Sequence, residues 1–596
     1  MPKRSFTTPR EVKVGTLPPK RTIVIRDPVH GYVRVAPHER IIVDHPITQR
    51  LRHVLQTGLA HLIYPEARTS RFVHSLGTMH LASRFLVACV ENAELPVARN
   101  LFDAVEKLLD KAMIKLEELD LLWSPATPGT QTGLLAARTV FPGRLTATEE
   151  RRYRQLLAFI EAGLRLAALF HDLGHLPFSH DLEFALELYA KKVRAAGQSL
   201  PKHVDKALTE GVPPHEQIGH KLAGLVLLSL VKPETPPVIR AVYVLAQDIL
   251  NAEPPHEKLE RPRADVLQWL HSLIDGEVDA DRGDYLLRDG RALGFEFAAY
   301  DLERLVDNLI LVHKDDLGFT TAIREAGLSA LETFFLARSR SNLAMVRHHK
   351  NAQAGVAFRH ASVAAFSTGH GLRFLEALGA LFDPQMKETA TIQKVLEEFA
   401  SFDDSFWMQA LRSIRDKEQD SLLSACLDLV LKRGTRLRSL WKRKGDVESE
   451  QLSQLNQLLE SGEHNVEFSR RREELERQGV LFIHHKFTPF RIFKQRRDTP
   501  GEQRETYSLM PVWTERRGLQ PAARLSSLIR GLKEAWKEEP HLHAFVEVDS
   551  SLDENKVLGH LLRELDSSTK SKGVPAPRPG RKRPEPRAVG SKDRKG

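Results

Sequence analysis

The chain has 596 residues, 41% hydrophobic and 28% charged, which is typical of a globular protein that buries a large core. Only Cys89 and Cys426 are present, which excludes a disulfide framework and a cysteine zinc cluster and suits a reducing compartment. No stretch approaches the roughly 18 to 20 uninterrupted apolar residues that span a bilayer, and no apolar segment follows Met1–Arg4. We therefore expect a cytoplasmic protein without a secretory signal or a membrane contact.

The net charge of +9 belongs to the two ends of the chain. Residues 1–26 carry +6 and residues 570–596 carry +8, so the body between them is net negative. This distribution argues against a core that binds nucleic acid, although it leaves open contact between nucleic acid and the basic ends. We expect residues 1–22 and 567–596 to be basic, disordered tails.

The predicted elements are mainly helical. A short β-hairpin around a Pro/Gly turn is expected first, in residues 22–35. Apolar residues then recur at helical spacing, and they predict helices over 46–56, 71–90, 101–122, 147–170, 215–230, 237–250, 264–274, 281–287 and 328–350. A loop by composition at 124–130 makes residues 95–150 resemble an insertion between two core helices.

The pattern changes toward the end of the chain. Residues 380–475 are helical and more charged, and short β-type runs at 480–483 and 544–548 flank a helix at 523–537. We therefore expect a mainly α protein with a small C-terminal α+β subdomain. The expected divisions are a helical core at 23–380 with an insertion at about 95–150, a helical extension at 381–475, and the α+β subdomain at 476–566.

One segment concentrates polar residues that are hard to explain by packing. The apolar run 163–170 leads into His171-Asp172-Leu173-Gly174-His175, and His180 follows. Aspartate is rarely buried without a partner, and imidazole beside carboxylate is a donor set that divalent metals take. Adjacent helical residues point about 100° apart, so His171 and Asp172 need further ligands from elsewhere in the chain. A histidine at position 74 and several carboxylates within 279–289 are available.

These motifs, in this order, resemble the HD-domain phosphohydrolases, whose signature is His … His-Asp … Asp. The similarity is greatest to the deoxynucleoside triphosphate triphosphohydrolase branch, which contains the vertebrate SAM-and-HD-domain enzyme. It covers residues 23–350 and is weaker from about 380 to 440; only about 22 residues precede it, so we expect no SAM domain. The matching pieces are Asp27-Pro28-Val29-His30-Gly31, Gln49-Arg50-Leu51-Arg52, Arg71 to Gly77, His171 to His180, His215-Glu216-Gln217 and Asp281 to Asp289.

The resemblance implies a metal centre with four protein ligands, which are His74, His171, Asp172 and Asp281. Two imidazoles with two carboxylates suit Fe, Mn, Zn or Ni, and Mg is expected as a second ion on the substrate phosphates. The alternative is structural: His74 packs in the core, and Asp281 caps a helix or pairs with an arginine.

The resemblance also implies the reaction, in which a dNTP and water give a deoxynucleoside and inorganic tripolyphosphate. His215 is expected to protonate the leaving 5′-oxygen, because a histidine near neutral pKa can act as acid and base. His175 and Glu183 match catalytic positions, with Glu183 standing where the close relative has Asp. The alternative for His175 and His180 is structural hydrogen bonding.

Further positions match residues that hold the substrate. Arg71, Arg282 and Lys350 match phosphate contacts, and His180 lies beside them in the same motif set. The residues that match positions around the sugar are Gln56, Tyr285 and Asp289, and the amide and the carboxylate among them would hydrogen bond to the 3′-hydroxyl. The alternative for Arg282 and Asp289 is that they are exposed charges. The family segment Tyr-x-His-Lys reads Arg347-His348-His349-Lys350 here, so an aromatic partner for the base is missing at that place.

A second nucleotide site follows from the same resemblance. Asp44, Gln49 and Arg52 match positions that bind an activating guanine nucleotide, and with activation we expect a homo-oligomer such as a tetramer. These residues could equally form a polar brace between helices, and Ile23 stands where the regulated relative has Lys.

Two rival functions stay open. One is an HD-fold phosphohydrolase that acts on another nucleotide, such as a ribonucleotide, a cyclic nucleotide or a dinucleoside substrate. The other is a nucleic-acid-binding or partner-binding protein that uses the core as a nucleotide sensor. In a dNTPase, the expected role is control of nucleotide pools, and antiviral or anti-phage defence would use the same activity.

Overall fold

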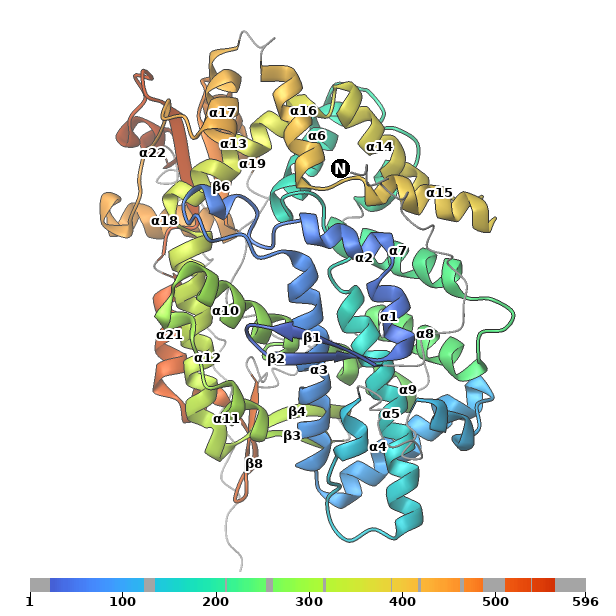
Figure 1. The fold of residues 1–596 in the computed structure, drawn as a ribbon. Coiled ribbons are helices and arrows are strands. Elements are labelled where there is room, and N and C mark those ends of the chain that lie inside the picture. The colour runs from blue at the N-terminus through green and yellow to red at the C-terminus, as the bar shows by residue number, and fades with distance from the viewer. Residues whose placement is uncertain are drawn as a thin grey trace, which may run out of the picture.

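The computed structural model describes residues 22–122, 134–208, 212–252, 261–314, 318–386, 388–415, 420–460, 466–485, 510–537 and 539–562. Helices dominate these residues and small sheets complete the fold, which confirms the predicted mainly α class (Figure 1). The tails expected at 1–22 and 567–596 lie outside the described residues, apart from Thr22.

Two long helices form the centre of the molecule, α3 (Arg71–Glu91) and α5 (Ala147–Phe170). They pack against each other, α8 (Pro237–Leu250) packs on α5, and α10 (Ala280–Leu293) packs on α3. A capping box at Thr146 begins α5, where the threonine side chain accepts from the amide of Glu149. Every side chain from Gln155 to Phe170 is buried, because α5 is surrounded by other helices.

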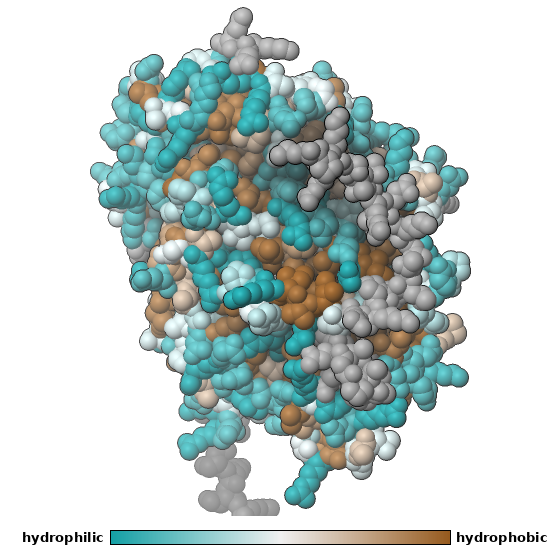
Figure 2. Space-filling model, viewed as in Figure 1, coloured by the Kyte–Doolittle hydropathy of each residue, from teal (hydrophilic) through white to brown (hydrophobic). Residues whose placement is uncertain are grey.

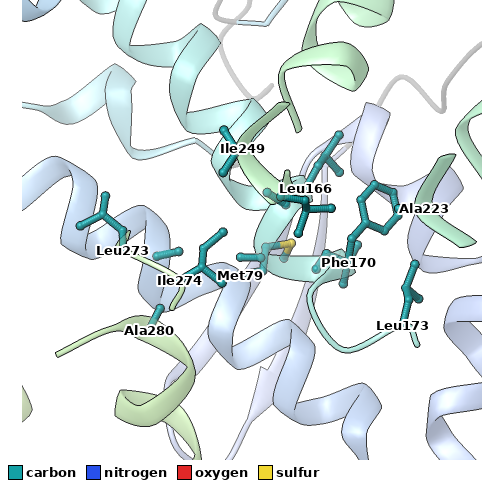
Figure 3. Close-up of a cluster of buried hydrophobic side chains, with 14 of the residues drawn as sticks. Met79, Leu166, Phe170, Leu173, Ala223, Ile249, Leu273, Ile274 and Ala280 are labelled. Carbon is teal, nitrogen blue, oxygen red and sulfur yellow. The ribbon is translucent and has the colours of Figure 1, made fainter. Parts of the chain in front are cut away.

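The apolar core lies directly behind the residues expected to bind metal. Figure 3 shows Met79, Leu166 and Phe170 converging with side chains from neighbouring helices. Phe170 directly precedes His171, and Ala280, which is also fully buried, directly precedes Asp281. Burying these apolar neighbours fixes the backbone from which the polar side chains extend.

The other helices surround this centre. In chain order they are α1 (Pro37–Val43), α2 (Pro46–Arg50), α4 (Leu95–Ala112), α6 (His180–Ala195), α7 (Pro214–Leu230), α9 (Arg261–Ser272), α11 (Leu302–Asp307), α12 (Leu328–Ser341), α13 (His349–Ala365), α14 (Gly369–Leu381), α15 (Thr389–Ala400), α16 (Asp404–Arg415), α17 (Ser421–Lys432), α18 (Ser449–Glu460), α19 (Val466–Arg477), α20 (Ala522–Leu525), α21 (Ser527–Lys537) and α22 (Glu554–Leu562).

The strands fall into small sheets. The predicted hairpin is present as β1 (Ile23–Asp27) and β2 (Gly31–Val35). A four-stranded sheet has the order β3 (Leu309–Lys314), β4 (Gly318–Arg324), β7 (Pro511–Thr514) and β8 (Gly518–Pro521), with β4 and β7 parallel. A three-stranded sheet has the order β5 (Leu437–Ser439), β9 (Leu542–Glu547) and β6 (Leu481–His484).

Several predicted helices differ in their bounds from the observed ones, and three of them end or break at an irregular turn. The helix predicted over 46–56 ends at Arg50 and continues as a 3-10 turn over 51–53, because Leu55 forms a β-bridge with Ser70. The helix predicted over 101–122 begins at Leu95 and ends at Ala112, where Met113 adopts a left-handed conformation; a 3-10 turn follows over 116–121. The helix predicted over 328–350 ends at Ser341 and passes through a π turn (Asn342–Val346) before α13 begins.

The described part of the 95–150 segment packs against α3 and α5 at the ends of these helices that lie away from His74 and His171. Phe102 of α4 stacks on Tyr153 near the start of α5, with ring centroids 4.3 Å apart. Phe141 contacts both rings, so this segment is anchored at the end of α5 opposite His171. Residues 123–133 lie outside the described residues.

The surface is largely polar. Figure 2 shows hydrophilic residues over most of one face, with apolar side chains gathered near its middle. Among the described residues, none of the helices has the length and apolar character needed to cross a membrane.

Candidate metal and catalytic site

Four side chains from two helices, α3 and α10, and from the turn after α5 converge beside the core. The Nε2 atom of His74 lies 2.9 Å from Asp281 Oδ1 and 3.6 Å from Asp172 Oδ2. The Nε2 atom of His171 lies 3.4 Å from Asp172 Oδ1 and 3.6 Å from Asp281 Oδ1. The structure thus brings together all four residues that the sequence predicts as metal ligands.

The far side of each imidazole fixes the orientation of its ring. His171 donates from Nδ1 to the carbonyl of Ala168 at 2.6 Å, and His74 donates from Nδ1 to Asp284 at 2.7 Å. These bonds turn both Nε2 atoms toward the carboxylates of the cluster. Metal-binding histidines are held in this way, with the second ring nitrogen bonded to a carboxylate or a carbonyl.

Two observations fit a cation among these residues. His171 Nε2 is buried, makes no hydrogen bond and faces the Asp172 and Asp281 carboxylates, so this ring nitrogen points into the cluster. Burial opposes a charge on His74, but hydrogen bonds to Asp281 and Asp284 outweigh it and raise the pKa of His74 to about 10. The cluster therefore attracts positive charge, and two imidazoles with carboxylates form a donor set that suits a divalent metal.

A buried network extends behind His74. Asp284 accepts from His74, from His30 Nε2 at 2.7 Å and twice from Arg288 at 2.8 Å. Arg288 also donates to Asp27 at 2.8 Å, so the β1–β2 hairpin supports the ring of a candidate ligand. Gly77 permits this approach, because a Cβ there would clash with the Asp284 carboxylate.

A second cluster adjoins the first. The Nδ1 atoms of three histidines face the Glu183 carboxylate, with distances of 3.0 Å for His175, 3.3 Å for His180 and 2.8 Å for His215. The rings of His175 and His215 stack with centroids 4.2 Å apart. His175 Nε2 lies 3.1 Å from Asp172, and this contact joins the two clusters.

The two stacked histidines have opposite electrostatic environments. Burial, Arg71 and His215 lower the pKa of His175 to about 3, so this ring stays neutral. Burial also opposes a charge on His215, but the Glu183 carboxylate outweighs it and raises the pKa of His215 above its usual value. Paired groups with pKa values pushed apart are typical of acid and base assignments, and His215 is the member of this pair whose charged form is stabilised.

Within the described residues, this second cluster also has the composition of a metal site. The ligand atoms of its three histidines and Glu183 all lie within 4.8 Å of one another, as do those of His74, His171 and Asp281. The first group differs by the unpartnered His171 Nε2, whereas all three histidines of the second group hydrogen bond to Glu183.

Arg71 connects the first cluster to the turn that follows α5. Its guanidinium is buried, donating from Nη1 to Asp172 at 2.6 Å and from Nε to Ser179 Oγ at 2.8 Å. Burial alone would raise the pKa of Asp172, but Arg71 and the neighbouring histidines hold it well below its usual value. Arg71 therefore lies beside the predicted ligands, and its phosphate contact stays a prediction.

Two residues predicted to hold the sugar have unpartnered acceptors. Gln56 Oε1 and Asp289 Oδ1 are both buried without a hydrogen-bond partner. The backbone carbonyl of Gln56 accepts from Arg71, and the charges of Arg71 and His74 act on Asp289. Burial raises the pKa of Asp289 to about 7. Tyr285 stands one helical turn before Asp289 on α10 and is half-buried.

The remaining predicted substrate residues have varied surroundings. Arg282 is buried and pairs with Asp279 and Asp275, so its phosphate contact stays a prediction. Lys350 lies in the first turn of α13 and is exposed overall. Partial burial of its amine and the nearby charges of Lys442 and Arg433 lower its pKa. The side chain of His180 is 56% exposed, which leaves it open to a ligand.

The residues predicted to bind a second nucleotide lie around α2. Gln49 accepts from Arg52 Nε at 2.7 Å, and the Arg52 guanidinium lies 3.7 Å from the centroid of the Phe72 ring. Asp44 instead pairs with Arg40 at 3.4 Å on the surface. The structure therefore brings Gln49 and Arg52 together, while Asp44 is paired with Arg40.

Several residues of the site carry roles that the sequence did not assign. Asp284 falls one turn after Asp281 on α10, so the spacing of the two carboxylates could have placed them on one face. Ser179, which binds Arg71, gives no signal in the sequence beyond its nearness to His180.

Comparisons with known proteins agree with this architecture. No family model matches the chain. An uncharacterized protein of Methanocaldococcus jannaschii is 26% identical over 329 residues, or 54% of this chain and 46% of that protein. Uncharacterized protein YwfO of Bacillus subtilis is 25% identical over 407 residues, or 67% of this chain and 68% of YwfO. The deoxynucleoside triphosphate triphosphohydrolase SAMHD1 of Xenopus laevis is 23% identical over 283 residues, or 46% of this chain and 34% of SAMHD1.

A solved structure shares the fold. The crystal structure of a phosphohydrolase from Bacteroides thetaiotaomicron aligns with a TM-score of 0.50 at 18% identity, over 88% of this chain and all of that chain. The chain thus shares the overall fold of that phosphohydrolase. With the SAMHD1 matches, this likeness supports the HD-domain phosphohydrolase family. The chain spans about half the length of the first curated relative it matches, and about a third of the frog SAMHD1.

Proposed function

We propose that this protein is a metal-dependent phosphohydrolase that converts a dNTP and water into a deoxynucleoside and inorganic tripolyphosphate. The observation that carries the proposal is the contact between the two clusters: a cation pocket and a proton-donating histidine are joined through Asp172 and His175. The partial similarity to SAMHD1 proteins supports the choice of a deoxynucleotide substrate.

A divalent cation bound by His74, His171, Asp172 and Asp281 would supply Lewis acidity toward a phosphoryl oxygen. The residues of the chain do the rest. Arg71 orients the phosphate and offsets its charge beside the ligands. Water adds to the α-phosphorus and releases one proton to solvent, the bond from phosphorus to the 5′-oxygen breaks, and the His215 imidazolium gives its proton to that oxygen. Glu183 holds the charged form of His215.

The sugar side supports a preference for a nucleoside with a free 3′-hydroxyl. Gln56 Oε1 and Asp289 Oδ1 are buried acceptors without partners, and a hydroxyl donor would satisfy either of them. A buried acceptor left unpaired costs about 1–3 kcal/mol, so a substrate that supplies a donor is favoured over one that does not.

The test is product analysis with the metal-replete protein and each dNTP and NTP, singly and mixed. We expect tripolyphosphate in the ³¹P NMR spectrum, and in H₂¹⁸O the label should enter the tripolyphosphate, because water attacks phosphorus. Protein stripped of metal by a chelator is the control. Release of phosphate or pyrophosphate would indicate another HD-fold nucleotide hydrolase, and no hydrolysis by metal-loaded protein would contradict the proposal.

We also propose that Gln49 and Arg52 take part in a site for an activating nucleotide. Arg52 is exposed and its guanidinium stacks on the Phe72 ring, and an exposed guanidinium of this kind can also contact a base. The Arg52→Ala variant should lose activation by added dGTP or GTP and keep its basal rate. Steady-state rates with and without the nucleotide measure this, and a wild-type protein that is not activated would refute the site.

A further inference from the structure

The turn that follows the candidate metal ligands has an unusual backbone. Phe178 and Ser179 are consecutive, neither is glycine, and both have a φ of 57°. Residues other than glycine adopt this region rarely and keep it only where the surroundings hold them. Ser179 binds the site from this turn: its Oγ accepts from Arg71 at 2.8 Å and donates to the carbonyl of Leu55 at 2.8 Å.

One carboxylate holds this turn from behind. Asp404, the first residue of α16, accepts from the amide of Phe178 through Oδ1 at 2.7 Å. Its Oδ2 accepts from the amide of Leu55 at 3.0 Å. Asp404 is only 9% exposed, so water does not replace these bonds easily. A single side chain therefore ties together the turn that bears Ser179 and the segment that bears Gln56.

A buried cation acts from the same side. Arg50 donates from Nη2 to the carbonyls of Leu173 and His175, at 2.8 Å each. Its Nη1 donates to the carbonyl of Phe402 at 3.0 Å, just before α16 begins. The loop from 173 to 179 is thus held by Arg50 through its carbonyls and by Asp404 through an amide. The support comes in part from the helical extension, whose helix α15 also packs on α2 (Figure 1).

We propose that Asp404 is a positioning residue for the phosphate and sugar side of the site. It fixes Ser179 and Gln56 relative to Arg71, and so sets where a substrate lies against the metal ligands. The inference rests on the proposed function, because it assumes that Arg71 and Gln56 bind substrate. Asp404 accepts from the amides of Leu55 and Phe178 and bonds to none of the four predicted ligands, so metal binding should not depend on it.

The first experiment compares Asp404→Ala with Asp403→Ala. Asp403 caps the same helix by accepting from the amide of Phe406 at 2.9 Å, so its loss weakens α16 without releasing the turn. For Asp404→Ala we expect kcat/KM for the dNTP to fall about ten- to a hundredfold, since small misplacements of substrate are costly, with the metal content unchanged. Asp403→Ala should retain both kcat and KM.

The second experiment does not depend on activity. Hydrogen exchange measured by mass spectrometry should accelerate at Leu55 and Phe178 in Asp404→Ala, and not in Asp403→Ala. A wild-type protein that hydrolyses no nucleotide would refute the proposed function alone, and the exchange rates would still report whether Asp404 holds the turn. Unchanged exchange, or wild-type kcat and KM in folded Asp404→Ala, would overturn the inference.

A third variant covers the case in which Asp404→Ala does not fold. Asp404→Asn keeps the shape of the side chain and one acceptor oxygen, while its NH₂ group cannot accept from the second amide. We expect a smaller fall in kcat/KM than for alanine, again with full metal content. Wild-type kinetics in folded Asp404→Asn would overturn the inference.

Discussion

We expect the His171→Ala variant to lose its bound metal and its kcat to fall on the order of a thousandfold or more. This fall is larger than the roughly 10–100-fold loss that follows when only a hydrogen-bond partner of a metal ligand is removed. The reason is geometric. His171 Nε2 is buried without a hydrogen bond, and the bond from Nδ1 to the carbonyl of Ala168 keeps Nε2 directed into the cluster. Removing it leaves one imidazole, on His74, to hold a cation among the carboxylates.

The measurements are metal content by mass spectrometry and the rate of dNTP hydrolysis on the same preparation. His370→Ala is the matched control, because His370 lies on α14 and its ring contacts Phe406, with a centroid distance of 5.7 Å, and no metal ligand. This control should keep both metal and rate. A His171→Ala variant that retains stoichiometric metal and wild-type kcat would show that the cation binds elsewhere, and the His175, His180, Glu183 and His215 group would be the next candidate.

The second large effect is expected for His215→Gln, in which kcat should fall about 10²–10⁴-fold, the contribution typical of general acid catalysis. The metal content should stay at the wild-type level, because the predicted ligands lie on the other cluster. Glutamine approximates the size of the ring and keeps a polar end toward Glu183, so loss of proton transfer is the main change. Stopped-time assays of deoxynucleoside release at saturating dNTP measure kcat directly.

The pH dependence distinguishes this role from a structural one. Glu183 raises the pKa of His215, and the reaction needs the protonated ring, so kcat of the wild type should fall as pH rises through that raised pKa. His215→Gln should lose this alkaline fall. Glu183→Gln should lower the pKa of His215 and move the fall to lower pH. An alkaline fall that is unchanged in His215→Gln would assign the proton to another group.

Local sequence patterns were sufficient to predict the elements whose bounds depend on capping and turn residues. The bounds of α5 and α8 were predicted correctly, because a capping box begins the first and a Pro-Pro pair precedes the second. The β1–β2 hairpin was recognisable from its turn residues. The four ligand positions came from the resemblance; the structure brings all four together, with the ligand atoms of His74, His171 and Asp281 within 4.8 Å of one another.

Long-range contacts decided the parts that the sequence did not predict. The helix predicted over 46–56 stops early because the amide of Leu55 donates to Asp404 and Leu55 forms a β-bridge with Ser70. Asp404 is distant in sequence, and no sequence pattern indicates the pairing with Ser70. The hairpin of β3 and β4 was not predicted, since a short apolar run such as Leu309–Val312 is compatible with a buried helix or a strand. Arg282 illustrates the limit of a resemblance: matching the position did not predict its ion pairs with Asp275 and Asp279.

The parallel pairing of β4 with β7 has a consequence for how the chain is made. Ile323 pairs with Val512, so the outer edge of β4 finds its neighbour only after nearly two hundred further residues have been synthesised. At about 5–20 residues per second, that interval is on the order of 10 to 40 seconds. During it the nascent chain presents an open strand edge, which is a template for pairing with other chains. Ribosome-bound intermediates of this protein should therefore depend on chaperones more than its finished fold does.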